Sequence, residues 1–159
     1  MISRNGPSPK EIPLLVELRA VYAETDKLLT GWSCPNTAEC CQFGLSGKEP
    51  FVTSIELVEM ELGLLAIGKR PGPKPKYPKE QERVKTRVCP MLTKDLKCSI
   101  YNNRPLGCRT FFCHRVVKGE KTTHQRWLEV VRKVQDIARR HRKHGEVGHP
   151  IGAVVGIPE

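Results

Sequence analysis

Three stretches of the chain repeat apolar residues at the spacing of one helix face. The first spans about residues 9–30, and its apolar face is made by Leu15, Leu18, Tyr22 and Leu29. Ser8 and Glu11 around Pro9 have capping-box spacing, which predicts a helix start there unless Pro13 moves it later. Gly31 is suited to end the helix, because glycine readily adopts a left-handed conformation. We interpret this stretch as an amphipathic core helix.

The second stretch begins near Thr53, where Thr53 and Glu56 again have capping-box spacing. Its apolar face is made by Ile55, Val58, Leu62 and Leu65, and Gly68 is placed to end it. Proline, asparagine and glycine punctuate the segment between the two helices, which predicts a loop. Residues 50–52 (PFV) are apolar enough to supply a short strand within it.

The third stretch spans about residues 123–143 and combines an apolar face with many basic residues. The face is made by Trp127, Val130, Val131, Val134, Ile137 and Ala138. A basic amphipathic helix can rest on nucleic acid or on an anionic membrane, but more often it packs on its own domain. The tail at 146–159 has no clear period and is predicted to be weakly ordered or extended.

Together these patterns predict a mainly helical fold, with a small α+β arrangement as the alternative. The 159 residues suit a single domain, residues 1–159, with three helices and long cysteine-bearing loops. Its parts are the helices and first cysteine group (8–68), a basic proline-rich loop (69–87), a second cysteine group (88–117), the basic helix (118–145) and the tail (146–159). Only 38% of the residues are hydrophobic, and seven of these are cysteines, so a metal staple would help the core.

The net charge of +10 permits an acidic partner but does not require one. Residues 69–87 hold eight basic and two acidic side chains with four prolines, which favours a solvated linker or surface loop. Nucleic acid could bind through this loop and through 126–143, but only 6% of the residues are aromatic and able to stack on bases. There is no apolar run of 18 residues and no signal-peptide pattern, so we expect a cytoplasmic protein without a transmembrane segment.

The seven cysteines form two groups with the spacing C-x5-C-C and C-x8-C-x9-C-x4-C. They are Cys34, Cys40, Cys41, Cys89, Cys98, Cys108 and Cys113. An odd number without an export signal argues against a full disulfide framework and favours metal ligation. Adjacent side chains usually point in different directions, so Cys40 and Cys41 are expected to serve two centres or different atoms of a polynuclear cluster. Alternatively, one of them is a ligand and the other is a packed or redox-active thiol.

Two motifs resemble those of a known family. Residues 34–41 read C-x-x-T-x-x-C-C, and residues 98–109 read C-S-I-Y-N-N-R-P-L-G-C-R. Together they resemble the bacterial cysteine-cluster proteins named for a C-x2-C-x2-C-C motif, also called the YkgJ type, over roughly residues 34–115. The chain departs from that pattern at Thr37, where the family has cysteine. Thr37 would leave a coordination position open or filled by another group, and the candidates are Cys113, His114 and His124.

The resemblance implies chelation of zinc or iron, with an iron–sulfur cluster as one form. All seven cysteines are candidate ligands, and Cys34, Cys40, Cys98 and Cys108 are expected to matter most because they belong to the two motifs. Three residues of the second motif, Tyr101, Arg104 and Arg109, could donate hydrogen bonds to thiolate sulfur and keep it deprotonated. The alternatives are surface ion pairs of the arginines with Asp95 or Glu120, and core packing for Tyr101.

Three functions remain open at this point. The first is a structural or metal-handling module that acts with a protein partner. The second is an iron–sulfur redox protein or a modifying enzyme, since lysine-methylating flagellar enzymes carry a similar cysteine cluster. The third is a metal-stapled nucleic-acid binder. Common nucleotide-binding and hydrolase motifs are absent from the sequence, and Cys113 beside His114 has poor geometry for a nucleophile–base pair. Whether the protein is an enzyme is left undecided.

Overall fold

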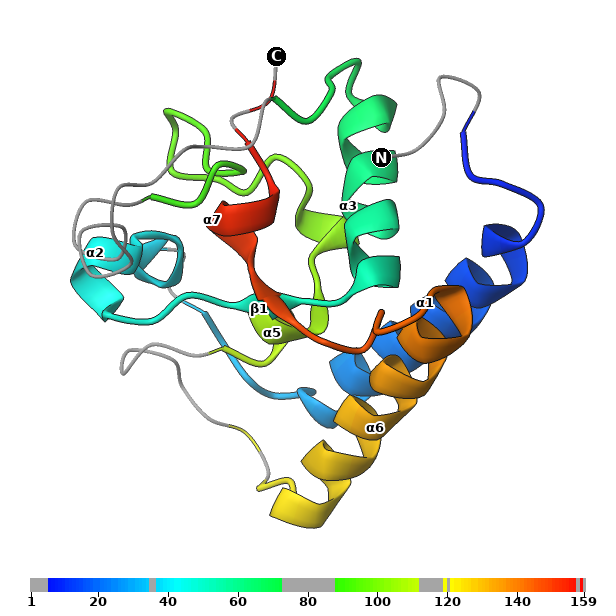
Figure 1. Cartoon of the computed structure of the whole chain (residues 1–159). Helices are drawn as coiled ribbons and strands as arrows, with labels where there is room; N and C mark the ends of the chain where they lie inside the picture. The colour runs from blue at the N-terminus through cyan, green and yellow to red at the C-terminus, as the bar shows by residue number, and fades with distance from the viewer. Residues whose placement is uncertain are drawn as a thin grey trace.

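The computed structural model describes residues 6–34, 37–72, 88–111, 119, 121–156 and 158. Three long helices dominate these residues: α1 (Glu11–Leu28), α3 (Ser54–Ala66) and α6 (His124–His141). The shorter elements are η1 (Glu39–Cys41), α2 (Phe43–Ser46), β1 (Phe51–Val52), η2 (Tyr101–Asn103), α5 (Leu106–Arg109), β2 (His149–Pro150) and α7 (Ile151–Val154). α1 and α6 lie side by side, and α3 packs against both (Figure 1). The mainly helical class, with three main helices and a very small sheet, is confirmed.

Of the two predicted capping boxes, the one at Thr53 starts its helix as expected, whereas the one at Ser8 lies before the start of its helix. At α3, the carboxylate of Glu56 accepts hydrogen bonds from the amide and the hydroxyl of Thr53, at 2.9 and 2.8 Å. At α1, the amide of Ser8 donates to Glu11 at 2.6 Å, but the helix begins at Glu11 and its N-cap is Lys10. Pro13 falls in the first turn, where no amide hydrogen is needed for the helix. The predicted start at Ser8 was therefore two residues early.

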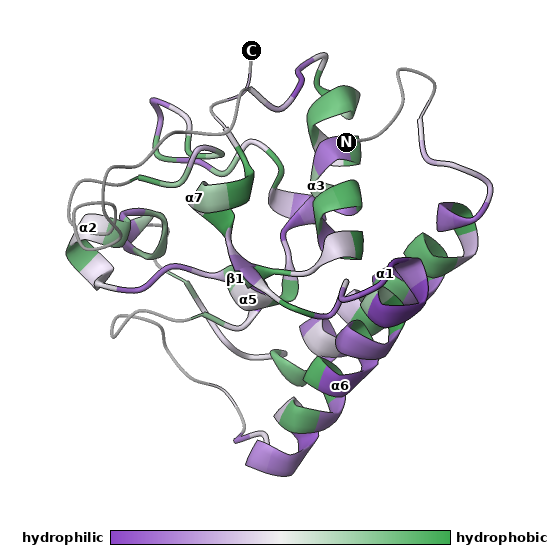
Figure 2. Ribbon diagram, in the orientation of Figure 1, coloured by the Kyte–Doolittle hydropathy of each residue, from purple (hydrophilic) through white to green (hydrophobic). Residues whose placement is uncertain are grey.

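One hydrophobic cluster joins the three long helices. Its buried residues are Leu15, Leu18, Val21, Tyr22, Ile55, Val58, Leu106, Val130, Val134, Ile137 and Ala138. Figure 2 shows hydrophobic and hydrophilic residues alternating along α1 and α6, as expected for helices with one apolar face. On the predicted face of α6, Val131 is 40% exposed and Trp127 is half-buried, so its buried stripe is narrower than the sequence indicated.

A second hydrophobic cluster fills the other half of the molecule and includes the cysteines. Its buried residues are Phe43, Val52, Met60, Leu64, Cys89, Met91, Ile100, Ile151 and Val155. Cys41, Cys98 and Cys108 pack against this cluster as partly buried members. α3 contributes to both clusters, so it is the element that joins the helical half to the cysteine half. We call the second cluster the thiol-side core.

The C-terminal tail is ordered over 149–155. The expectation of a weakly ordered or extended segment agrees with β2, which is extended, but is wrong for α7, which is helical. β2 pairs antiparallel with β1, with Val52 opposite His149. The α7 turn follows at once and buries Ile151 to 1% exposure in the thiol-side core. Elements of two and four residues are too short to produce a recognisable period, which is why the sequence pattern missed them.

Many basic residues of α6 are paired with carboxylates of α1. Arg126 and Lys133 both contact Glu24, and Arg140 contacts Glu17. These contacts favour the interpretation that α6 packs on its own domain and leaves its remaining charges in water. Most of the basic loop 69–87, from residue 73 onward, lies outside the described residues. Among the described helices, none has both the length and the apolar character needed to cross a bilayer.

Gly63 allows the loop with the second cysteine motif to approach α3 closely. A Cβ atom at Gly63 would lie 2.8 Å from Cβ of Asn103, whose amide donates to Glu59 at 2.7 Å. Glycine to alanine inside a helix normally stabilises by about 0.5–1 kcal/mol. Here we expect Gly63→Ala to destabilise by about 1–3 kcal/mol because the added methyl group overpacks the contact.

Chemical denaturation of the wild type and the variant measures the effect of Gly63→Ala. Asn103→Gly removes the opposing Cβ, so it should cost less in the Gly63→Ala background than in the wild type. A stabilised Gly63→Ala protein would show that α3 and the loop are not in close contact.

Candidate metal centre

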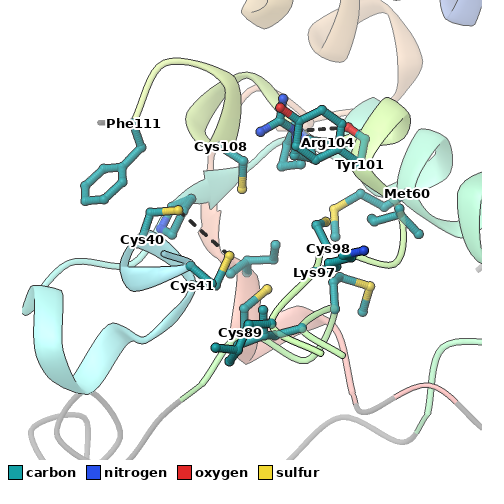
Figure 3. A pocket seen from close by; sticks show the side chains of 18 of the residues that line it. Cys40, Cys41, Met60, Cys89, Lys97, Cys98, Tyr101, Arg104, Cys108 and Phe111 are labelled. Carbon is teal, nitrogen blue, oxygen red and sulfur yellow. Dashed lines mark hydrogen bonds between the residues drawn. The ribbon is translucent and has the colours of Figure 1, made fainter. Parts of the chain in front are cut away.

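One cavity of about 390 Å³ is walled by cysteines from both sequence groups. The cysteines that line it are Cys34, Cys40, Cys41, Cys89, Cys98 and Cys108. Figure 3 shows the thiols of the last five arranged around the same space, on segments far apart in the sequence. The seventh, Cys113, and the neighbouring His114 lie outside the described residues. The fold thus brings six of the seven predicted ligands to one cavity.

Two thiols of adjacent residues in η1 are in direct contact. The Sγ atoms of Cys40 and Cys41 are 3.9 Å apart. Two sulfurs on one tetrahedral zinc ion, each about 2.3 Å from the metal, are about 3.8 Å apart. The expectation that these neighbours point in very different directions is wrong, because η1 is a single tight turn. Ala38, in the left-handed region at φ +56°, leads the chain into that turn.

The second cysteine group reaches the same cavity through a backbone contact and a hairpin. The amide of Cys89 donates to the carbonyl of Cys41 at 2.7 Å, which holds the two groups together. Leu92 and Cys98 then form an antiparallel bridge, and the turn between them is closed by a hydrogen bond from the amide of Thr93 to the carbonyl of Lys97. The hairpin returns the chain so that Cys98 lies on the cavity wall near Cys89.

Cys108 lies on α5, which is anchored to α3 by a buried carboxylate. The amide of Leu106, the first residue of α5, donates to Glu56 at 2.7 Å. The same carboxylate accepts from the Tyr22 hydroxyl at 3.2 Å and from Thr53, and Glu56 is only 2% exposed. The sequence identified Glu56 as a capping residue alone. Its second role, the hydrogen bond from the amide of Leu106, joins residues that are 50 positions apart. No local sequence pattern indicates such a contact.

The two motif arginines play different parts. Arg109 is 8% exposed and donates to Asp26, to the carbonyl of Asn102 and to the carbonyl of Arg104. Its guanidinium also lies over the ring of Tyr22, 4.3 Å from the centroid. Its carboxylate partner is Asp26 rather than Asp95, and Glu120 lies outside the described residues. Arg109 therefore holds the cysteine loop onto α1.

Arg104 is the arginine whose charge reaches the thiols. Its guanidinium stacks on the ring of Tyr101 at 3.6 Å, and its Nε donates to the Tyr101 carbonyl at 2.9 Å. Its positive charge favours the thiolate form and so acts to lower the pKa of Cys40, Cys98 and Cys108. Tyr101 is 54% exposed, so the core-packing alternative for it is wrong.

Contacts with neighbouring thiols and burial nevertheless raise the pKa of Cys40, Cys41, Cys98 and Cys108, which favours their protonated form. Burial raises the pKa of Cys108 and Cys98. For Cys41, the contact with Cys40 lowers the pKa, but the neighbouring Cys89 thiol and burial raise it to about 12. Several crowded thiols of this kind become thiolates together only when a cation compensates their charge. The donor chemistry therefore fits a soft transition-metal ion such as zinc or iron.

The thiols are spread around the cavity wall and do not meet at one point. Within the described ranges, no three His, Cys, Asp or Glu side chains converge as a ready-made ion site. Cys40 and Cys41 have ligand spacing already, whereas further ligands would have to rotate towards them. Of the three candidates for the position vacated at Thr37, only His124 lies within the described residues, and neither Thr37 nor His124 lines the cavity. His124 is instead the first residue of α6.

A second arrangement, which sequence reasoning did not find, links the three long helices. The imidazole of His141 lies 2.9 Å from Oγ of Ser54 and 3.1 Å from a carboxylate oxygen of Glu11. The order resembles a serine–histidine–acid relay, but Ser54 is 4% exposed and packs against the backbone of Gly145. A hydroxyl covered in this way has no room for a substrate, so the group ties α1, α3 and α6 together.

Comparison with known protein families gives one match. A family model with the description "CxxCxxCC: Putative zinc- or iron-chelating domain" matches residues 33–131. The match spans η1, the hairpin, α5 and the first part of α6, so it contains all six cysteines that line the cavity. No curated protein and no solved structure matches the chain significantly. The resemblance indicated by the two sequence motifs is confirmed.

Proposed function

The chain belongs to the CxxCxxCC family of zinc- or iron-chelating domains, and from this premise we propose that it binds its metal in the thiol-lined cavity. The proposed ligands are Cys40, Cys41, Cys89, Cys98 and Cys108. One observation carries the proposal: these five thiols come from three separate segments and line one space, with the sulfurs of Cys40 and Cys41 3.9 Å apart. Cysteines kept only as small apolar residues would not need to gather in this way.

The role we propose is that of a structural or metal-handling module that acts with a protein partner. A structural contribution is supported by the position of four of the five thiols, Cys41, Cys89, Cys98 and Cys108, which belong to the thiol-side core and join η1, the hairpin and α5. Metal exchange is supported by Cys34, which is exposed yet lines the same cavity. A thiol at the rim gives an incoming ion a first ligand before it reaches the buried ones.

An iron–sulfur centre with redox or modifying activity is the second candidate. It is favoured by the number of thiols, because six in one cavity exceed the four that a single tetrahedral zinc takes. A single ion is favoured by the short distance between Cys40 and Cys41. Anaerobic purification, followed by elemental analysis and an absorption spectrum, separates the two candidates. One equivalent of zinc without colour supports the first, and iron with inorganic sulfide supports the second.

Serine substitutions test which thiols hold the metal. We expect Cys41→Ser and Cys89→Ser to lose most of the bound metal, because these thiols are in mutual contact within the core. Sequence motifs placed Cys34 among the four most important cysteines, but its exposure leads us to expect a smaller effect. Metal per protein, measured by plasma mass spectrometry after extensive dialysis, gives the readout.

Cys34→Ser is the matched control in this series, since it removes one thiol from the same cavity at its exposed rim. It should retain most of the metal and load it more slowly. If Cys41→Ser and Cys89→Ser keep full metal, the cavity is not the metal site.

A further inference from the structure

A second cleft adjoins the thiol cavity and is rich in arginine. It has a volume of about 440 Å³, and its lining includes Arg19, Asp26, Tyr101, Arg104 and Arg109. We call it the arginine cleft. Tyr101 and Arg104 line both the arginine cleft and the thiol cavity. The stacked pair labelled in Figure 3 is therefore a wall shared by the two spaces.

Arg104 differs from the other two arginines of the cleft in its partners. Arg19 pairs with the buried Glu59 at 2.9 Å, and Arg109 pairs with Asp26 at 2.8 Å. No carboxylate in the described part of the chain pairs with Arg104. Nε of Arg104 donates a hydrogen bond to the Tyr101 carbonyl, and the guanidinium stacks on the Tyr101 ring. The two terminal amino groups of Arg104 therefore remain as donors. A guanidinium held in this way is prepared to bind a carboxylate or phosphate through two hydrogen bonds.

The thiol cavity on the other side of this wall is mostly apolar. Besides the cysteines, its lining includes Phe43, Met60, Met91, Ile100 and Ile151. Its volume of about 390 Å³ is within the range of small-molecule pockets, roughly 300–1,000 Å³, and exceeds what one metal ion occupies. An apolar space of this size beside an unpaired arginine suits a ligand with one charged end and one apolar end.

We propose that the protein binds a small organic oxyanion, with its carboxylate or phosphate on Arg104 and its apolar part in the thiol cavity. The shared wall, the apolar lining and a guanidinium without a carboxylate partner among the described residues support this site, whichever metal the thiols hold. A ligand in this position lies beside the cysteines, so its binding would report on, or alter, access to them.

Calorimetric titration of the protein as purified tests the proposal. The probes are straight-chain carboxylates of increasing length and alkyl phosphates of matching length, and the two series identify the preferred head group. We expect one saturable site, with affinity rising about fourfold per added methylene as the chain enters the apolar cavity. Inorganic phosphate, which lacks an apolar part, should bind much more weakly.

Three variants test whether binding needs the guanidinium of Arg104 or only a positive charge on the protein. Arg104→Gln should weaken binding at least tenfold, and Arg104→Lys should weaken it as well, because the ammonium group lacks the planar fork. Arg132→Gln, which removes the same charge from the exposed side of α6, should leave binding unchanged. Metal content is measured for each variant, so loss of metal is scored separately from loss of the ligand.

Three outcomes would overturn the proposal. One is an affinity that does not change with chain length, and another is equal binding by Arg104→Gln and Arg132→Gln. Loss of metal in Arg104→Gln with unchanged ligand affinity would also overturn it, since Arg104 would then serve only as a counter-ion for thiolates. If Arg104→Gln does not fold, an NMR titration of the wild type tests the proposal instead. Added ligand must then shift the Nε–H resonance of Arg104 and leave the Nε–H resonance of Arg132 unchanged.

Discussion

Removal of the metal is expected to unfold the cysteine half of the domain while the three long helices persist. The thiol-side core is built around Cys41, Cys89, Cys98 and Cys108, whereas the cluster that joins α1, α3 and α6 contains no cysteine. Without a cation, the thiols make only weak contacts with one another as neutral groups, and the segments that carry them keep just their backbone hydrogen bonds and apolar packing. A metal present at 100 times its Kd contributes about 2.7 kcal/mol of stability, and tighter binding contributes more.

Hydrogen exchange followed by mass spectrometry measures this difference between the two halves. After chelation, the protection factors of peptides covering 43–52 and 89–108 should fall by about 100-fold or more. A 100-fold fall corresponds to about 2.7 kcal/mol. Peptides from α1 and α6 should change little. Cys41→Ser, which we expect to hold little metal, serves as the control because the chelator should have almost no further effect on it.

Equal loss of protection in α1 and α6 would contradict this expectation. It would mean that the two clusters unfold as one cooperative unit and that the metal stabilises the whole chain. Unchanged protection throughout would mean that the thiol-side core needs no metal, and the structural part of the proposed role would then be wrong.

The elements that sequence reasoning located are those whose signals are local. The start of α3 depends on Thr53 and Glu56, three residues apart, and their capping interaction forms as predicted. The second cysteine motif is similarly compact, and its Arg104 lies near the thiols as expected. For the same reason, the apolar faces of α1 and α6 could be identified from their period alone.

The features that were missed depend on contacts between distant segments or on one turn. Cys40 and Cys41 lie close together because η1 is a 3-10 turn, which a rule for regular helices and strands does not describe. Arg109 pairs with Asp26, 83 residues away, and no pattern near either residue indicates that contact. The order of the C-terminal tail depends on a two-residue pairing with β1. Local periodicity carries no information about any of these contacts.

Glu56 illustrates this limit and leads to the second large effect that we expect. Its carboxylate joins the start of α3, the hydroxyl of Tyr22 on α1 and the amide of Leu106 on α5. Glu56→Gln keeps the size of the side chain but replaces one acceptor oxygen with a donor that faces hydrogen-bond donors. We expect the free energy of unfolding to fall by about 2–4 kcal/mol, since at least one buried donor loses its acceptor.

The loss should extend to the metal site, because α5 carries Cys108 and its first amide would no longer be anchored. We therefore expect Glu56→Gln to retain less metal after dialysis than the wild type. Urea denaturation and elemental analysis of the same preparations give the two readouts. Glu17→Gln, which alters only an exposed ion pair between α1 and Arg140, is the control and should change neither value appreciably.

Thr53→Val separates the two roles of the Glu56 carboxylate. It removes the capping hydroxyl but leaves the contact between Glu56 and Leu106 in place, and loss of a cap costs about 1 kcal/mol. If Glu56 anchors α5 as well as capping α3, Glu56→Gln must cost clearly more than Thr53→Val and must alone lower metal retention. Equal costs with full metal in both variants would show that Glu56 acts only as a helix cap. The position of Cys108 would then have to be set by the packing of Pro105 and Leu106 rather than by this buried carboxylate.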